Sequence, residues 1–198
     1  MKWLLVAISL LLLVSAATIT VVVESEGDYK NEVFGGAGPA RALILYHPSR
    51  DAHFSDELSL ALARGLVSAG FAVERATLTG ATPDALSSYQ LVAVVSNTYW
   101  WTPDRPTLRY LARARLDGIA ALGIIGGAGS TGRSQRLLDE ALRKSGARVI
   151  STRSFWIFRP NDETDSGEPN RRLAMRLAEQ LGRDMGRQLT AAGAGQLN

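Results

Sequence analysis

Strand-like runs and helix-like repeats alternate regularly along most of the chain. Runs typical of buried strands occupy residues 42–46, 71–78, 91–96, 119–125 and 148–158. Helical spacing of apolar residues marks 52–70, 107–115, 134–145 and 170–189. This alternation, with short connections, predicts an α/β fold: a doubly wound parallel sheet covered by helices on both faces. Its five strands are expected in the order 2-1-3-4-5.

The first 23 residues have a different pattern. From Trp3 to Val23 no residue is charged, which is about the length that a helix needs to cross ~30 Å of hydrocarbon. Lys2 and the small residues Ser15 to Ala17 also fit a cleaved signal peptide, but the apolar stretch continues past them to Val23. We therefore expect a single-pass transmembrane anchor in residues 1–23, in contact with membrane lipid through residues 3–23. The flanking charges do not set its orientation.

Three further segments follow the predicted anchor. Residues 24–40 are polar and glycine-rich, without an apolar period, and predict a linker. Residues 41–189 form the predicted globular domain, long enough to bury a core of ordinary size. Residues 190–198 are small and polar, and we expect a flexible tail there.

Composition excludes several classes of function. The chain has no cysteine, so disulfides, zinc–thiolate sites, iron–sulfur clusters and a cysteine nucleophile are ruled out. It has 22 Lys and Arg against 19 Asp and Glu, for a net charge of +3, and the basic residues are dispersed. This distribution predicts no nucleic-acid partner.

Three loops carry the candidate chemistry, because ligands of doubly wound sheets bind outside the carboxyl ends of the strands, where strand order reverses. The loop after the first strand, 47–55, leads directly into a helix, whose amino terminus suits a phosphate. The loop at 96–103 holds a tyrosine and two tryptophans, which suit a flat conjugated ligand. The loop at 126–132 is rich in glycine, which lets backbone approach a ligand closely.

Each loop also has a structural interpretation. Ser49 or Asp51 would serve equally as a helix cap, whereas Ser49, His53, Ser55 and the charge of Arg50 would hold a phosphate. The aromatic residues would also pack against a neighbouring helix or a membrane surface. Glycines at strand ends are common for conformational reasons alone. Together, the three loops predict a pocket for a planar ring that bears a phosphate.

The chain resembles the flavodoxins and the flavodoxin-like NAD(P)H:quinone and FMN reductases. The resemblance covers residues 41–189, and the loops are its most specific part. His47-Pro48 with His53-Phe54-Ser55 is similar to the first loop of the quinone reductases. Ser96-Asn97-Thr98-Tyr99-Trp100-Trp101 resembles the flavodoxin loop whose aromatic residues flank the isoalloxazine ring. Gly126-Gly127-Ala128-Gly129 resembles the third loop, along the flavin ring.

The resemblance implies FMN as the cofactor and NAD(P)H as the electron donor. Tyr99 and Trp100 would cover the ring, and backbone N–H groups near Trp101 and Gly127 to Gly129 would contact its pyrimidine edge. The ribityl phosphate would be held by Ser49, His53, Phe54 and Ser55. The remaining cofactor-binding positions are Ser96, Asn97, Thr98, Gly126 and Ala128. No side chain is expected to be catalytic, because the flavin carries the redox chemistry.

The family also implies partners and a location. The acceptor would be a quinone or a redox protein, and the membrane anchor would hold the domain near lipid quinone. The domain is expected on the cytoplasmic side, where FMN and NAD(P)H occur. A homodimer is left open.

Two other hypotheses remain. The first is a metal site formed by the two histidines, His47 and His53, together with Asp51. The spacing of these residues matches no known ligand motif, so we expect no metal. The stronger rival is a membrane-tethered flavodoxin-fold binding or scaffold module that has lost FMN, because Arg50, Asp51 and Asn97 depart from the family's loops.

Overall fold

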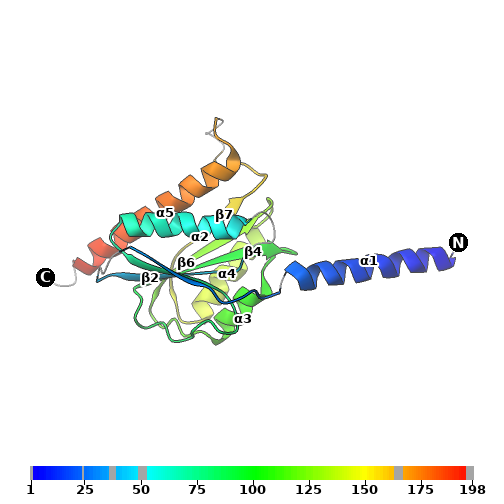
Figure 1. Cartoon of the computed structure of the whole chain (residues 1–198), viewed down its shortest axis with the longest axis horizontal. Helices are drawn as coiled ribbons and strands as arrows, with labels where there is room; N and C mark the ends of the chain where they lie inside the picture. The colour runs from blue at the N-terminus through cyan, green and yellow to red at the C-terminus, as the bar shows by residue number, and fades with distance from the viewer. Residues whose placement is uncertain (1, 24, 36–38, 49–52, 163–166, 195–198) are drawn as a thin grey trace.

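A parallel sheet lies at the centre of the domain, with helices on both of its faces (Figure 1). The structure is a computed structural model and describes residues 2–23, 25–35, 39–48, 53–162 and 167–194. Its parallel strands lie side by side in the order β3 (Ala72–Thr77), β2 (Arg41–Tyr46), β4 (Leu91–Tyr99), β6 (Ala120–Gly127) and β7 (Arg148–Trp156). These are the five strands that the apolar runs predict.

The whole sheet has seven strands, so the predicted count of five is wrong. The short strand β1 (Asn31–Phe34) pairs antiparallel with the edge strand β3, and β5 (Thr102–Pro103) pairs antiparallel with the end of β4. β1 lies within the segment that we expected to be a linker. Its residues are mostly exposed, and the exposed fraction of Val33 is 75%. Main-chain hydrogen bonds to β3 therefore hold this strand in place, and no apolar pattern marks it in the sequence.

The helices form two layers, each over its own half of the core. Helices α2 (Phe54–Ser68) and α5 (Asn170–Ala194) cover one face, and α3 (Arg105–Arg113) and α4 (Gly132–Lys144) cover the other. Alternate residues of β2 enter the two halves: Ile44 packs under α2, whereas Leu43 and Leu45 face α3 and α4. Strands that are buried on both faces explain the continuous apolar runs of the sequence.

Helix α1 (Lys2–Val23) extends away from the sheet (Figure 1). Among the residues that the structure describes, no helix is both long and apolar enough to cross a membrane. The predicted transmembrane anchor and the membrane localisation are therefore wrong. The prediction rested on the length of the uncharged apolar stretch, whereas α1 also carries hydroxyl groups such as that of Thr18, which donates a hydrogen bond to Val14 O at 2.9 Å.

Helix α5 continues five residues beyond Leu189, to Ala194, and so takes up the first half of the segment that we expected to be a tail. Residues 195–198 lie outside the described residues. The extension brings the end of α5 close to the amino ends of the strands, where Leu189 and Ala192 line a pocket with Phe71 and Ala120.

Candidate functional site

The carboxyl ends of β4 and β6 and the start of α2 converge on a small pocket. It has a volume of about 240 Å³ and is lined by residues of all three candidate loops and of the segment after β7: Phe54, Asn97, Thr98, Tyr99, Gly126, Gly127, Ala128 and Ile157. All but Ile157 are among the positions that the sequence singles out. The topology of the sheet thus brings residues more than 40 positions apart into one cavity.

The first loop reaches this pocket through Phe54, which is almost fully buried. Ser49, Arg50 and Asp51 lie outside the described residues. His53 is exposed, and its backbone is in the left-handed region with φ of 60°. Ser55 is fully buried, and its hydroxyl donates to His47 O at 2.7 Å, so in this structure it holds the loop onto the helix.

Two carboxylates lie in the first turn of α2, where a phosphate was expected. Asp56 pairs with the buried Arg75, and Glu57 pairs with Arg171 across a distance of 2.7 Å. Carboxylates in the first turn neutralise the positive end of the helix dipole that would attract a phosphate. The arginines offset this effect, because they compensate the charge of each carboxylate.

The aromatic residues of the second loop lie on a tight turn between β4 and β5. Tyr99 pairs with Thr102 across the turn and lines the pocket. Trp100 and Trp101 form the two-residue loop, with φ of 51° and 59° and exposed fractions of 60% and 56%. Two consecutive positive φ values are characteristic of a type I′ turn, which Asn-Gly normally occupies. Two bulky residues in that conformation cost roughly 1–2 kcal/mol each.

The glycine loop after β6 is shaped by its neighbours. A Cβ atom at Gly126 would lie 3.3 Å from the ring of Phe54, and one at Gly127 would lie 2.7 Å from Thr131. The carbonyl groups of Gly127 and Ala128 accept hydrogen bonds from the backbone of Ile157 and Phe158. Gly129 follows, next to Arg159. The glycines therefore let Phe54 and Thr131 pack against the pocket wall, whatever else the loop binds.

A buried carboxylate lies beneath the pocket. Asp104 is fully buried, and its Oδ2 atom accepts hydrogen bonds from Ser96 Oγ at 2.8 Å and from Asn97 N at 2.7 Å. Its Oδ1 atom accepts from Thr107 N at 2.9 Å and so caps α3. His47 Nδ1 lies 3.6 Å from Oδ2, a distance that suits an ion pair but exceeds a hydrogen bond.

His47 connects this cluster to the first loop. Its carbonyl accepts from Asn97 Nδ2 at 2.9 Å as well as from Ser55, and its Nε2 atom lies 3.1 Å from Ser25 O. Three of the expected flavin-binding side chains, Ser55, Ser96 and Asn97, thus make internal hydrogen bonds. Their described role is to fix the first two loops relative to each other.

The two buried ionisable groups shift each other's pKa in the direction of an ion pair. Burial alone would lower the pKa of His47, but the Asp104 carboxylate and the Ser25 carbonyl outweigh it and raise that pKa above its usual value. Burial alone would raise the pKa of Asp104, but His47 and the hydrogen bonds from Thr107 hold it below its usual value.

Solved structures with this arrangement of elements include flavodoxins, flavodiiron proteins and an NAD(P)H:quinone oxidoreductase. An archaeal flavodoxin aligns with a TM-score of 0.61 at 17% identity, over 76% of this chain and 99% of its own. The fold is flavodoxin-like. The NAD(P)H:quinone oxidoreductase from Methanothermobacter marburgensis aligns with a TM-score of 0.52 at 16% identity, over 74% of this chain and 98% of its own. The flavodiiron protein from Giardia intestinalis gives 0.59 at 18% identity, over 77% of this chain and 36% of its own.

No protein-family model matches the sequence, and no curated protein is detectably similar to it. At identities below 20%, the structural neighbours establish the flavodoxin-like fold and leave the ligand to the residues of this chain.

The pocket suits a planar ring with a polar edge. Phe54 and Tyr99 supply aromatic surface, and the glycine loop supplies backbone at close range. The Thr98 hydroxyl lines the same pocket, is buried, and has no hydrogen-bond partner within the described part of the chain. A buried hydroxyl without a partner is costly, so a polar ligand group at this position would satisfy it. The residues around the ring position therefore fit a flavin.

The histidines do not form a metal site in the described part of the chain, where no group of three His, Asp or Glu side chains could hold an ion. His47 is directed at Asp104 and Ser25, while Asp51 lies outside the described residues.

Sequence reasoning missed Asp104 and Ile157. Asp104-Arg105-Pro106 is recognisable as the start of a helix, with a capping aspartate and a proline in the first turn. Nothing in that local pattern shows that the same carboxylate lies against His47, which is 57 positions away. Ile157 follows the end of β7 and gave no loop motif.

Proposed function

We propose that this chain binds FMN at the pocket formed by the carboxyl ends of β4 and β6 and the start of α2, and uses it for electron transfer. One observation carries the proposal. The pocket combines Tyr99 and Phe54 with the glycine loop and an unpartnered buried hydroxyl at Thr98. The flavodoxin-like fold supports the same location, because its ligand edge coincides with the pocket.

The proposed roles divide by loop. Tyr99 and Trp100 cover the flavin ring, and backbone N–H groups near Trp101 and from Gly127 to Gly129 contact its pyrimidine edge. The ribityl phosphate would be held at the start of α2 by Ser49, His53, Phe54 and Ser55. FMN supplies the redox chemistry, and the side chains of this chain bind and orient it and exclude water.

We further propose a nicotinamide nucleotide as the electron donor and a quinone or a redox protein as the acceptor. The structural similarity to an NAD(P)H:quinone oxidoreductase supports this reaction class. The exposed Trp100 and Trp101 beside the pocket give a flat aromatic acceptor a surface to contact.

The alternative is a flavodoxin-fold binding module without FMN. The first turn of α2 favours it, because Asp56 and Glu57 already engage Arg75 and Arg171 there and the Ser55 hydroxyl already donates to His47 O.

An absorption spectrum separates the two functions. The purified full chain is mixed with FMN, freed of unbound flavin by gel filtration, and then reduced anaerobically with NADH or NADPH. If the protein retains the flavin absorption bands and NADH or NADPH bleaches them, the reductase is supported. If only dithionite bleaches the retained bands, electron transfer from another donor is supported. A colourless protein contradicts both and leaves the binding module.

A further inference from the structure

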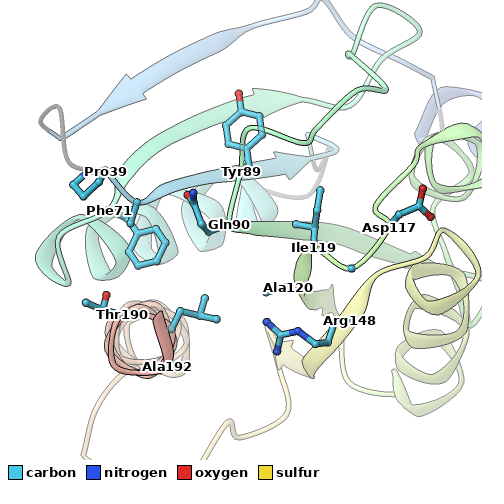
Figure 2. Close-up of a pocket in the computed structure, with 13 residues that line it drawn as sticks. Pro39, Phe71, Tyr89, Gln90, Asp117, Ile119, Ala120, Arg148, Thr190 and Ala192 are labelled. Atoms are coloured by element: carbon cyan, nitrogen blue, oxygen red, sulfur yellow. The ribbon is translucent and has the colours of Figure 1, made fainter. Parts of the chain in front are cut away.

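A second and larger pocket lies at the opposite edge of the sheet, where the parallel strands begin (Figure 2). Its volume is about 780 Å³, within the range of small-molecule sites, about 300–1,000 Å³. Phe71 directly precedes β3, Ile119 directly precedes β6, and Leu189 belongs to the last turns of α5. These side chains give the pocket an apolar wall.

One cation projects into this apolar space. Figure 2 shows Arg148 extending from the start of β7 toward α5, whereas the carboxylate of Asp117 points away from the pocket. Within the described residues, the Arg148 guanidinium has no hydrogen-bond or ion-pair partner. Arg41, at the start of β2 on the same edge, is by contrast occupied, since it pairs with Glu74 and lies over the Tyr89 ring.

Gln90 adds a neutral donor at the same pocket. Its Oε1 atom accepts a hydrogen bond from Arg41 N at 2.5 Å, which fixes the amide and leaves its NH₂ group as the donor. Tyr89 and Thr190 also line the pocket, but their hydroxyl groups already donate to Glu74 and to Gly186 O. The polar groups that remain for a ligand are therefore the Arg148 guanidinium and the Gln90 amide.

We propose that this pocket binds an amphipathic organic anion, with its carboxylate or sulfonate on Arg148 and its apolar body against Phe71, Ile119 and Leu189. A guanidinium recognises an acidic group through charge-assisted hydrogen bonds, and the Gln90 amide, which is turned toward the start of β2, remains a donor for another polar group of the ligand. The apolar wall gains by burying the rest of the molecule. The site lies at the other end of the sheet from the flavin pocket, so it stands whether or not FMN binds.

Calorimetric titration of the full chain with 1-naphthoate tests the proposal, with neutral 1-naphthalenemethanol as the matched probe. Arg148→Gln is expected to weaken 1-naphthoate binding about tenfold, the effect of one charge-assisted hydrogen bond. Arg187→Gln, an exposed charge on α5 outside the pocket lining, serves as the control and is expected to stay within about twofold. The neutral probe should bind wild type and Arg148→Gln equally and weakly.

Two further variants locate the bound anion. Ala192→Trp places a large side chain at the pocket and should reduce binding, and Arg148→Lys should restore part of what Arg148→Gln loses. Thermal melting confirms that each variant is folded. Unchanged 1-naphthoate affinity in Arg148→Gln, or no binding to the wild type, would overturn the proposal.

Discussion

Trp100 and Trp101 hold a backbone conformation that asparagine and glycine adopt more easily. Both side chains are more than half exposed, so burial does not explain their presence. Strain of this kind tends to persist where a ligand or partner uses the side chains.

Replacing the pair by Asn-Gly therefore separates stability from function. In the double variant Trp100→Asn/Trp101→Gly, the free energy of unfolding is expected to rise by about 1–2 kcal/mol, because the strain of the positive φ angles in the turn is removed. Its FMN affinity should fall. Chemical denaturation and FMN titration measure the two effects. An unchanged FMN affinity would show that the tryptophans do not contact the flavin.

Thr98 allows a similar separation within the pocket. Thr98→Val keeps the shape of the side chain and removes a hydroxyl that has no partner in the described structure. We expect the FMN-free variant to be more stable than the wild type by about 1 kcal/mol, because it removes a buried polar group that has no partner, and FMN affinity to fall about fivefold, the effect of one neutral hydrogen bond. Denaturation and flavin titration of the same samples provide both values. A large loss of stability would instead assign the hydroxyl a structural role.

The His47–Asp104 pair predicts a defined pH dependence of stability. Because folding lowers the pKa of Asp104, its contribution is present above about pH 4 and is lost as pH falls through the folded pKa. Because folding raises the pKa of His47, its contribution is complete below about pH 6.5 and is lost as pH rises through the folded pKa. The pair should stabilise the fold most between these values.

Asp104→Asn is expected to lower the free energy of unfolding by about 3 kcal/mol near pH 6, since it leaves a buried histidine without its counter-ion. His47→Gln should flatten the decline of stability above about pH 6.5, whereas His53→Gln, at an exposed position, should retain it. Unfolding curves at several pH values test this. A decline that survives in His47→Gln would contradict the assignment.

At the scale of elements, α2 and α5 pack closely enough to exclude a methyl group. A Cβ atom at Gly65 would lie 2.0 Å from Glu179 O, and one at Gly182 would lie 2.5 Å from Leu62 O. Helix backbones approach this closely only where both carry glycine. The contact sets the position of α2 and, with it, of Phe54 in the flavin pocket.

Gly65→Ala is therefore expected to destabilise the domain by at least about 2 kcal/mol, despite the higher helix propensity of alanine. Gly132→Ala is the matched control, because the nearest atom to its added Cβ is the flexible end of Arg136 at 4.0 Å. That variant should be neutral or slightly stabilising. Equal stability of the two variants in denaturant would show that the helices can separate without loss.

The elements that the sequence predicts well are those whose patterns are strong and local. The runs at 42–46, 91–96 and 119–125 are buried on both faces, so nearly every position is apolar and the strands are unambiguous. β1 and β5 escape prediction because four and two residues, held by main-chain pairing, carry no periodic signal. The helix of residues 2–23 was predicted, but its assignment to a membrane was not correct.

At the scale of the whole molecule, the chain has a pocket at each end of one sheet. The smaller lies at the carboxyl ends, where the rule for doubly wound folds places ligands, and the sequence located most of its lining from loop composition. Loop composition could not predict the hydrogen bonds of the Ser55 and Ser96 side chains, because their partners, His47 O and Asp104, are brought close only by the tertiary fold. The larger pocket lacks a motif, since its lining comes in pieces of one to four residues from the beginnings of the five parallel strands and from the end of α5.

The measurement that tests the central claim most directly is a fluorescence titration of FMN with the full chain and with Tyr99→Ala. The account predicts saturable quenching by the wild type and an affinity at least about tenfold lower in Tyr99→Ala, because ring contact with an aromatic side chain is lost. Tyr29→Ala, at a partly exposed tyrosine outside the pocket lining, should titrate like the wild type. Absence of quenching by the wild type, or equal affinities of wild type and Tyr99→Ala, would contradict flavin binding at this pocket.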